Sequence, residues 1–201
     1  MSIPVPKDCM NKAVTTLARA FVGYPYPGGA VKGDDRQEKC LLSMFDLELE
    51  RVSRFGELRT DTSGCNGVAV WCRMGDLNAG VSLSKQMRAL ITTMTLPEII
   101  KTLRRCISVE RGRDKMNLAD DVEYLYILGV NPECQGKGIG SALVREKIAQ
   151  CDREHRRMYL ESNSEHNVGF YQSFGFVLVK TIVEERGKFT TWYMIREPQE
   201  P

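Results

Sequence analysis

The segment from Tyr124 to Ser141 constrains the fold of this chain more than any other. It opens with aromatic and aliphatic residues that predict a strand, and Pro132 ends that strand. Three glycines spaced by one residue follow and lead into residues 142–148, which have helical composition. Glycines in such a loop let the backbone turn its N–H groups inward, and the start of a helix adds unpaired N–H donors. The sequence therefore predicts a strand, an anion-binding loop and a helix, with Lys137 adding a positive charge.

Two common phosphate-binding motifs match this loop poorly. The Walker loop would need glycine at Asn131 and a hydroxyl residue at Gly138. A dinucleotide fingerprint would need glycine at Ser141, and its one supporting feature is Glu161, about 20 residues further on at the end of a predicted strand. The Walker interpretation fails, and the dinucleotide interpretation stays open but weak.

A third pattern matches better, and it identifies a family resemblance. Gln135, Gly138 and Gly140 form Gln-x-x-Gly-x-Gly, which resembles the acetyl-CoA loop of the GNAT acetyltransferases. Residues 167–176, Asn-Val-Gly-Phe-Tyr-Gln-Ser-Phe-Gly-Phe, follow at the separation expected in that family. Shorter segments resemble the puromycin N-acetyltransferase branch of that family: residues 20–25, 68–71, 160–161 and 191–194. With these segments included, the resemblance covers nearly the whole chain.

The resemblance implies an α/β fold of the GNAT type in one domain that spans residues 1–201. Its sheet is expected to be mixed and mostly antiparallel, with six to seven strands, a central pair that splays at Gly129, and helices on its flanks. Residues 75–121 share no motif with the puromycin branch. They are interpreted as a helical insertion before the cofactor strand that covers the acceptor site.

Hydrophobic periodicity and turn residues place the other elements. Thr95 and Glu98 form a capping box that begins the second helix of the insertion. The polar residues 111–115 after it predict a mobile loop. Expected helices lie at 11–22, from 34 or 35 to before 56, 87–94, 96–103, 139–153 and 168–173; expected strands lie at 58–60, 68–71, 124–130, 158–161, 176–184 and 189–196, with a hairpin turn at 185–188 and a helix stop at Gly175.

Composition excludes several classes of function. The 28 basic and 26 acidic residues leave a net charge of +2 without a basic stripe, which argues against nucleic acid as a partner. Seven widely spaced cysteines and two histidines form no recognisable metal site and are expected to be reduced, as in the cytoplasm. No apolar run is long enough for a membrane span, and no signal-peptide core is present. A monomer and a homodimer are both compatible with these features.

The GNAT resemblance implies that acetyl-CoA is the co-substrate, and that an amine of a small molecule attacks its thioester directly in a ternary complex. It assigns the carbonyl oxygen to the backbone amide of Leu128 and the departing thiolate to Tyr171 as general acid. Glu161 is the first candidate for the general base and Glu123 the second. The expected cofactor contacts are Leu128, Gly129, Val130, Gln135, Gly136, Lys137, Gly138, Ile139, Gly140, Ser141, Asn167 and Tyr171, with no metal.

Alternatives remain open for these assignments. The acceptor is alternatively a protein or peptide, and a non-catalytic acyl-CoA sensor on the same fold would keep the loop. Tyr171 is alternatively a packed core ring, Asn167 a helix N-cap before Val168, and Glu161 a solvated carboxylate. A covalent route through Cys134 lacks a paired histidine and is disfavoured. An apolar wall for the acceptor is expected from the methionines and isoleucines of the insertion, although core packing is the commoner role for such stripes.

Overall fold

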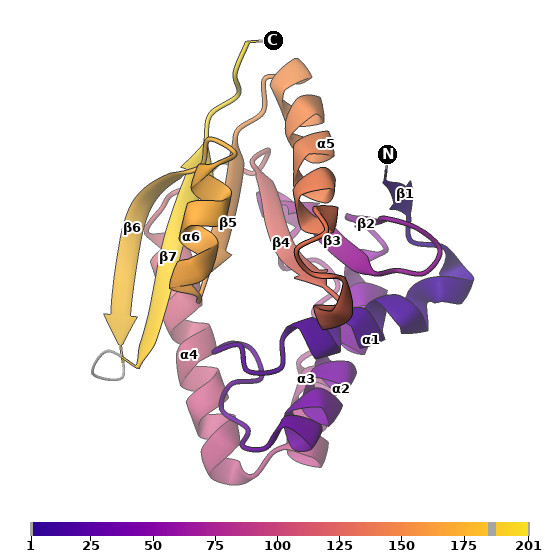
Figure 1. Ribbon diagram of the computed structural model, residues 1–201. Helices are drawn as coiled ribbons and strands as arrows, with labels where there is room; N and C mark the ends of the chain where they lie inside the picture. Colours follow the sequence, from indigo (N-terminus) through magenta and orange to yellow (C-terminus); the bar gives the residue numbers. More distant parts are fainter. Residues whose placement is uncertain (1, 185–187, 201) are drawn as a thin grey trace.

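A seven-stranded mixed sheet forms the centre of the protein in a computed structural model, which describes residues 2–184 and 188–200 (Figure 1). Its strand order is β1-β2-β3-β4-β5-β7-β6. Only β4 and β5 pair in parallel, and every other neighbouring pair is antiparallel. The expected GNAT-type sheet is confirmed. The strands are β1 (Ile3–Pro4), β2 (Glu57–Thr60), β3 (Gly67–Arg73), β4 (Glu123–Val130), β5 (Met158–Ser162), β6 (Val177–Glu184) and β7 (Phe189–Arg196).

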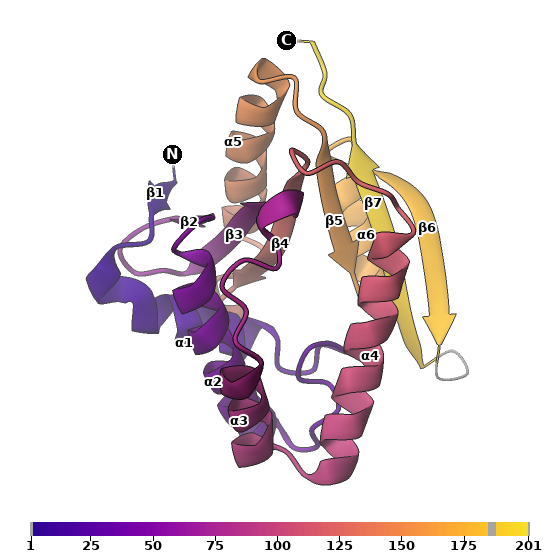
Figure 2. The same cartoon turned by 180° about the vertical axis from the view of Figure 1, so that it is seen from behind.

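Helices cover both faces of this sheet. One face packs on α5 (Ile139–Arg153) and α6 (Glu165–Gln172). The other face packs on α1 (Met10–Ala20), α2 (Asp34–Val52) and, at β7, α4 (Leu96–Asp114). Figure 2 shows α4 standing apart from α1, α2 and α3 (Leu83–Thr93) on this second face. Three short 3-10 helices complete the described elements: η1 (Lys7–Cys9), η2 (Met74–Asp76) and η3 (Pro132–Cys134).

The sheet opens between its two central strands. Strands β4 and β5 pair only at residues 123–125 and 158–160, and they then diverge (Figure 1). Against β3 the register shifts at the same point, because Trp71 pairs with Leu125 while Val70 pairs with Ile127. Tyr126 is therefore the extra residue of a β-bulge, which bends β4 away from β5. The splayed pair is confirmed, but its divergence begins at Tyr126 and not at Gly129.

The inserted helices are longer than the sequence predicts. The capping box at the start of α4 is present, since the Thr95 amide donates to Glu98 Oε2 at 2.8 Å. The mobile loop expected at 111–115 is wrong, because α4 continues to Asp114. Gly112 lies in this last part, and a Cβ there would lie 1.9 Å from Tyr193 Oη. Glycine thus lets the helix backbone contact β7, and the polar neighbours of Gly112 do not end the helix.

The C-terminal elements also differ in detail from the prediction. Helix α6 begins at Glu165, so Asn167 lies inside the helix and Ser164 occupies the N-cap position. The alternative interpretation of Asn167 as a helix cap is therefore wrong. Gly175 has φ +84°, as its expected role at a helix stop requires. Residues 185–187 of the hairpin turn predicted between β6 and β7 lie outside the described part of the chain.

Candidate active site

A cavity of about 1000 Å³ lies where β4 and β5 diverge. The end of β4, the glycine loop and α6 line one part of it, and α2, α3 and α4 line the other. Of the residues predicted to hold the cofactor, only Lys137 does not line it; Lys137 Nζ instead donates to the carbonyl of Glu133 at 3.1 Å. The structure thus brings together Leu128, Gly129, Val130, Gln135, Gly136, Gly138, Ile139, Gly140, Ser141, Asn167 and Tyr171.

The glycine loop presents backbone donors at the start of α5. Gly136 and Gly138 have φ of +74° and +79°, values that side chains other than glycine rarely adopt. Gly138 is the N-cap residue of α5, and no side chain caps the helix in the described part of the chain. The first N–H groups of α5 therefore remain available at the positive end of the helix dipole. This arrangement suits a phosphate group.

The edge of β4 exposes backbone groups in the gap between the strands. Asn131 donates its amide to the carbonyl of Asn66 at 2.8 Å, so these two residues form a hydrogen-bonded antiparallel pair. Pair types alternate along the ladder, which makes the pair of Leu128 with Ala69 non-hydrogen-bonded. The N–H and C=O of Leu128 thus point away from β3, as do those of Val130. Because β5 does not pair here, both residues can bind an extended ligand as a further strand.

Tyr171 combines the two roles that the sequence left open. Its ring packs edge-to-face against Phe170 and Phe176, with centroid distances of 5.1 and 6.0 Å. Its side chain also lines the cavity, and no described residue hydrogen-bonds to its hydroxyl. Burial raises the pKa of this phenol above its ordinary value of 10.0, and the nearby Tyr24 raises it further. Tyr171 is therefore a protonated donor without a protein partner.

Glu161 lies on the cavity wall but is fully engaged. Arg113 donates Nε and Nη2 to its two carboxylate oxygens at 2.6 and 2.9 Å. Tyr159 and Tyr124 add hydroxyl donors at 2.7 and 3.2 Å. With so many donors bound, the carboxylate has little capacity left for a proton from the acceptor. The role of Glu161 as general base stays a prediction that this geometry does not favour.

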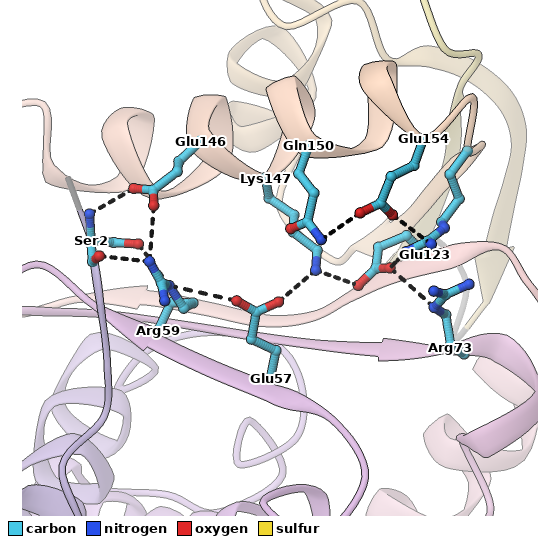
Figure 3. Close-up of polar contacts among 10 residues, drawn as sticks. Ser2, Glu57, Arg59, Arg73, Glu123, Glu146, Lys147, Gln150 and Glu154 are labelled. Atoms are coloured by element: carbon cyan, nitrogen blue, oxygen red, sulfur yellow. Dashed lines mark hydrogen bonds and ion pairs between the residues drawn. The ribbon is translucent and has the colours of Figure 1, made fainter.

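Glu123, the second candidate base, does not face the cavity. This residue is 3% exposed and lies beneath α5, where its carboxylate is 3.0 and 2.9 Å from Lys147 and Arg156 and 3.4 Å from Arg73. Figure 3 shows it within a polar cluster that joins α5 to β2, β3 and β4. The expectation that Glu123 faces the cleft is wrong, because alternate residues of a strand lie on opposite faces of the sheet. Its role is to hold α5 on the sheet.

Several residues of the cavity were missed by sequence analysis. Glu48 in α2 accepts a hydrogen bond from Tyr126 at 3.0 Å. Tyr24 lies 3.2 Å from Ser162 Oγ and accepts a bond from the amide of Asn163 at 2.9 Å. Residues 20–25, which contain Tyr24, contributed to the family resemblance, but no contact in the site was predicted for them. Nothing in the local pattern of α2 distinguishes Glu48 from its solvated neighbours.

The wall of the cavity on the insertion consists of other residues than expected. Met87 and Ile91 are 38% and 65% exposed and do not line the cavity, and Met94 is buried among Leu90, Ile99 and residues of α2. The lining side chains from α3 and α4 are instead Leu83, Gln86, Ala89, Leu90, Thr102, Leu103, Cys106, Val109, Glu110 and Arg113.

No helix in residues 2–184 or 188–200 is long and apolar enough to cross a membrane. Within the same residues, no group of histidine, cysteine, aspartate and glutamate side chains is arranged to hold a metal ion. All seven cysteines are free thiols.

Comparisons with known proteins agree with this architecture. Residues 102–178 match the family model of the acetyltransferase (GNAT) domain. An uncharacterized N-acetyltransferase of Schizosaccharomyces pombe is 38% identical over 78 residues, which are 38% of this chain and 32% of that protein. The match thus spans about a third of the relative's length.

Solved structures extend the likeness to the whole chain. One is the crystal structure of "histone acetyltransferase HPA2 and related acetyltransferase" from Corynebacterium glutamicum, with TM-score 0.67, 20% identity, and coverage of 100% of this chain and 97% of that one. Another is arylalkylamine N-acetyltransferase 2 from Aedes aegypti, with TM-score 0.62, 14% identity and 99% coverage of both chains. At these identities the likeness shows the fold. Residues 102–178 therefore resemble a GNAT acetyltransferase domain, and the whole chain shares the GNAT fold.

Proposed function

We propose that this protein is an acetyl-CoA-dependent N-acetyltransferase that acetylates the amine of a small molecule by direct transfer in a ternary complex. One observation carries the proposal: a single cavity joins the glycine loop, the open edge of β4 and the hydroxyl of Tyr171. An anion site, an extended-ligand site and a proton donor are the parts that transfer from a CoA thioester needs.

The cofactor would lie in the part of the cavity that is lined by the end of β4, the glycine loop and α6. Its pyrophosphate would accept bonds from the loop and from the first turn of α5. Its pantetheine arm would pair with the free backbone groups of Leu128 and Val130, and Asn167 would add a side-chain bond. The match to the GNAT domain supports acetyl-CoA over a dinucleotide.

The chemical step uses the backbone amide of Leu128 on β4 and the hydroxyl of Tyr171 on α6. The neutral amine attacks the thioester carbonyl, whose oxygen accepts a bond from the Leu128 amide as negative charge develops. The C–S bond then breaks, and the departing thiolate takes the proton of the Tyr171 hydroxyl. The amine nitrogen loses a proton to a base or to solvent. The free hydroxyl of Tyr171 favours an enzyme over a non-catalytic acyl-CoA sensor.

The acceptor would occupy the other side of the cavity, which is lined by α2 and by the inserted helices α3 and α4. Cover by α3 and α4 favours a small amine over a folded protein, because a folded protein would have to displace these helices. The resemblance to the puromycin N-acetyltransferase branch points the same way and stays a prediction.

The test is binding and turnover with the purified protein. Calorimetry with acetyl-CoA, longer acyl-CoAs and NAD would measure cofactor choice, and free CoA release would measure turnover with small amines and with peptides. We expect acetyl-CoA to bind and small amines to be acetylated. Binding of NAD in place of acetyl-CoA would overturn the proposal, and turnover with peptides alone would reassign the acceptor.

A further inference from the structure

The positive charges of the acceptor side are already neutralised. Arg51 donates Nε and Nη2 to Glu48 at 3.0 and 2.8 Å, and its Nη1 donates to two backbone carbonyls at 2.8 and 2.9 Å. Arg113 is held by Glu161. These are the only arginines or lysines among the described residues that line the cavity. An acceptor with a carboxylate or phosphate would therefore lose its hydration without gaining a free cation.

The charge that remains open is negative. Glu110 lies on α4 one turn before Arg113 and lines the same cavity. Its Oε1 accepts a long bond from the Cys106 thiol at 3.4 Å, and no described lysine or arginine forms an ion pair with it. The carboxylate of Glu110 is thus available to a cation that enters from solvent.

The wall around these charges is apolar and aromatic. The rings of Tyr24 and Phe45 pack edge-to-face on Phe21 at 5.0 and 5.1 Å, and all three line the cavity. Tyr26 and Leu90 extend this surface towards α4 and α3. Such a wall binds aromatic or alkyl groups through burial of their surface and through edge-to-face contacts.

From these three observations we infer that the acceptor is an apolar alkyl or arylalkyl primary amine that carries no acidic group. Its body lies against the aromatic wall, and Glu110 neutralises its ammonium before the nitrogen loses its proton. This inference rests on the proposed acetyltransferase function and narrows its acceptor class.

Two matched pairs of amines test the absence of an acidic group. The first is 2-phenylethylamine against phenylalanine, and the second is hexylamine against 6-aminohexanoate; in each pair only the second compound carries a carboxylate. We expect kcat/KM to be at least about tenfold higher for the amine without the carboxylate in both pairs. Equal values within either pair would overturn the inference.

Variants of Glu110 test whether its carboxylate binds the ammonium of the acceptor. Glu110→Gln should raise KM for 2-phenylethylamine about fivefold with kcat nearly unchanged, as expected for loss of one solvent-accessible charge contact. Glu110→Asp should restore part of the affinity. The matched control is Asp46→Asn, which removes the same charge from an exposed position of α2 outside the cavity and should leave KM unchanged.

Affinity for acetyl-CoA separates a failure of the acceptor assignment from a failure of the proposed acetyltransferase function. If acetyl-CoA binds and other amines are acetylated while both apolar amines are refused, the inference is wrong and the acetyltransferase function stands. If KM of Glu110→Gln moves no more than KM of Asp46→Asn, the placement of the ammonium is wrong. Failure to bind acetyl-CoA would remove the proposed function itself.

Discussion

Arg113 and Glu161 lie 48 residues apart in the chain and form a bidentate ion pair of 2.6 and 2.9 Å between α4 and β5. The pair is largely buried, and its aromatic neighbours Tyr124 and Tyr159 also donate to the carboxylate or contact the guanidinium. It fixes the inserted helix against the C-terminal half of the sheet. The inserted helix α4 is therefore a fixed part of the cavity wall, held in place by this ion pair.

Loss of one partner of this pair should destabilise the fold. Arg113→Met leaves the Glu161 carboxylate buried without its counter-charge, so we expect the free energy of unfolding to fall by about 3 kcal/mol. Urea denaturation measures this change. Glu161→Gln should show a loss of similar size, and if Glu161 were the general base it would also remove the acidic limb of the kcat/KM profile. An unchanged profile in a folded, less stable Glu161→Gln variant would leave only the structural role.

Gly138→Asp should weaken acetyl-CoA binding at least about tenfold. An added Cβ would meet nothing within 4 Å, so the effect is expected from the carboxylate beside the pyrophosphate and from the positive φ of +79°. Calorimetry measures the affinity. The control is Gly33→Asp, since Gly33 is also an N-cap glycine with open space and φ +85°, but it does not line the cavity. Equal affinities of the two variants would remove the loop from the site.

Tyr171→Phe should lower kcat by about 10² to 10⁴ while acetyl-CoA affinity and melting temperature change little, because the ring stays packed and only the donor is lost. Free CoA release measures turnover. Tyr193→Phe is the control: it removes a buried hydroxyl that donates to the Val109 carbonyl at 3.2 Å, outside the cavity, and should affect stability more than kcat. A Tyr171→Phe variant within about threefold of wild type would mean that the thiolate finds its proton elsewhere.

The raised pKa of Tyr171 adds a pH test. A phenol whose pKa lies above 10.0 keeps its proton as the pH rises, so the acid form persists through the whole alkaline range of an assay. We expect kcat of the wild type to show no alkaline decline below about pH 10. A decline centred near pH 8 would show that another group supplies the proton.

Leu103→Ala should raise KM for the acceptor and spare acetyl-CoA affinity, because Leu103 lines the acceptor side of the cavity. Ile100→Ala is a close control, since Ile100 lies one turn earlier on α4 and is 43% exposed, against 37% for Leu103, without lining the cavity. Loss of one apolar contact of this kind is expected to change KM by about three- to tenfold. Equal effects of the two variants would contradict the assignment of this wall.

Asp152→Asn should destabilise the protein chiefly above pH 4. Arg196 donates to Asp152 at 2.5 and 2.8 Å, and this bonding holds the pKa of the carboxyl below its ordinary value of 3.8. A depressed folded pKa contributes stability above the unfolded pKa, and that contribution is lost as the pH falls through the folded one. Urea denaturation at about pH 7 and about pH 3 should show a smaller difference in the variant than in wild type. Equal pH dependence would place the acid sensitivity elsewhere.

Sequence patterns predicted what depends on local order. The strand, glycine loop and helix around Gly138, and the helices with clear apolar stripes, follow from periodicity and turn chemistry. What they could not supply depends on distant partners. Gly112 predicts a helix end, yet it lies inside α4, because the hydroxyl of Tyr193 occupies the space that a side chain at this position would fill. Glu123 and Glu161 look equivalent near their strand ends, and only the alternation of side chains between the two faces of the sheet puts one under α5 and the other in the cavity.

The opening between β4 and β5 has a mechanical consequence. The two halves of the sheet share backbone pairs only at residues 123–125 and 158–160, so beyond Leu125 the seam is held by side chains such as Arg113 and not by a ladder. A ligand laid along the free edge of β4 replaces the missing ladder and acts as a strut between the halves. Without such a ligand, the two halves are joined at this seam only by the short paired segment and by side-chain contacts.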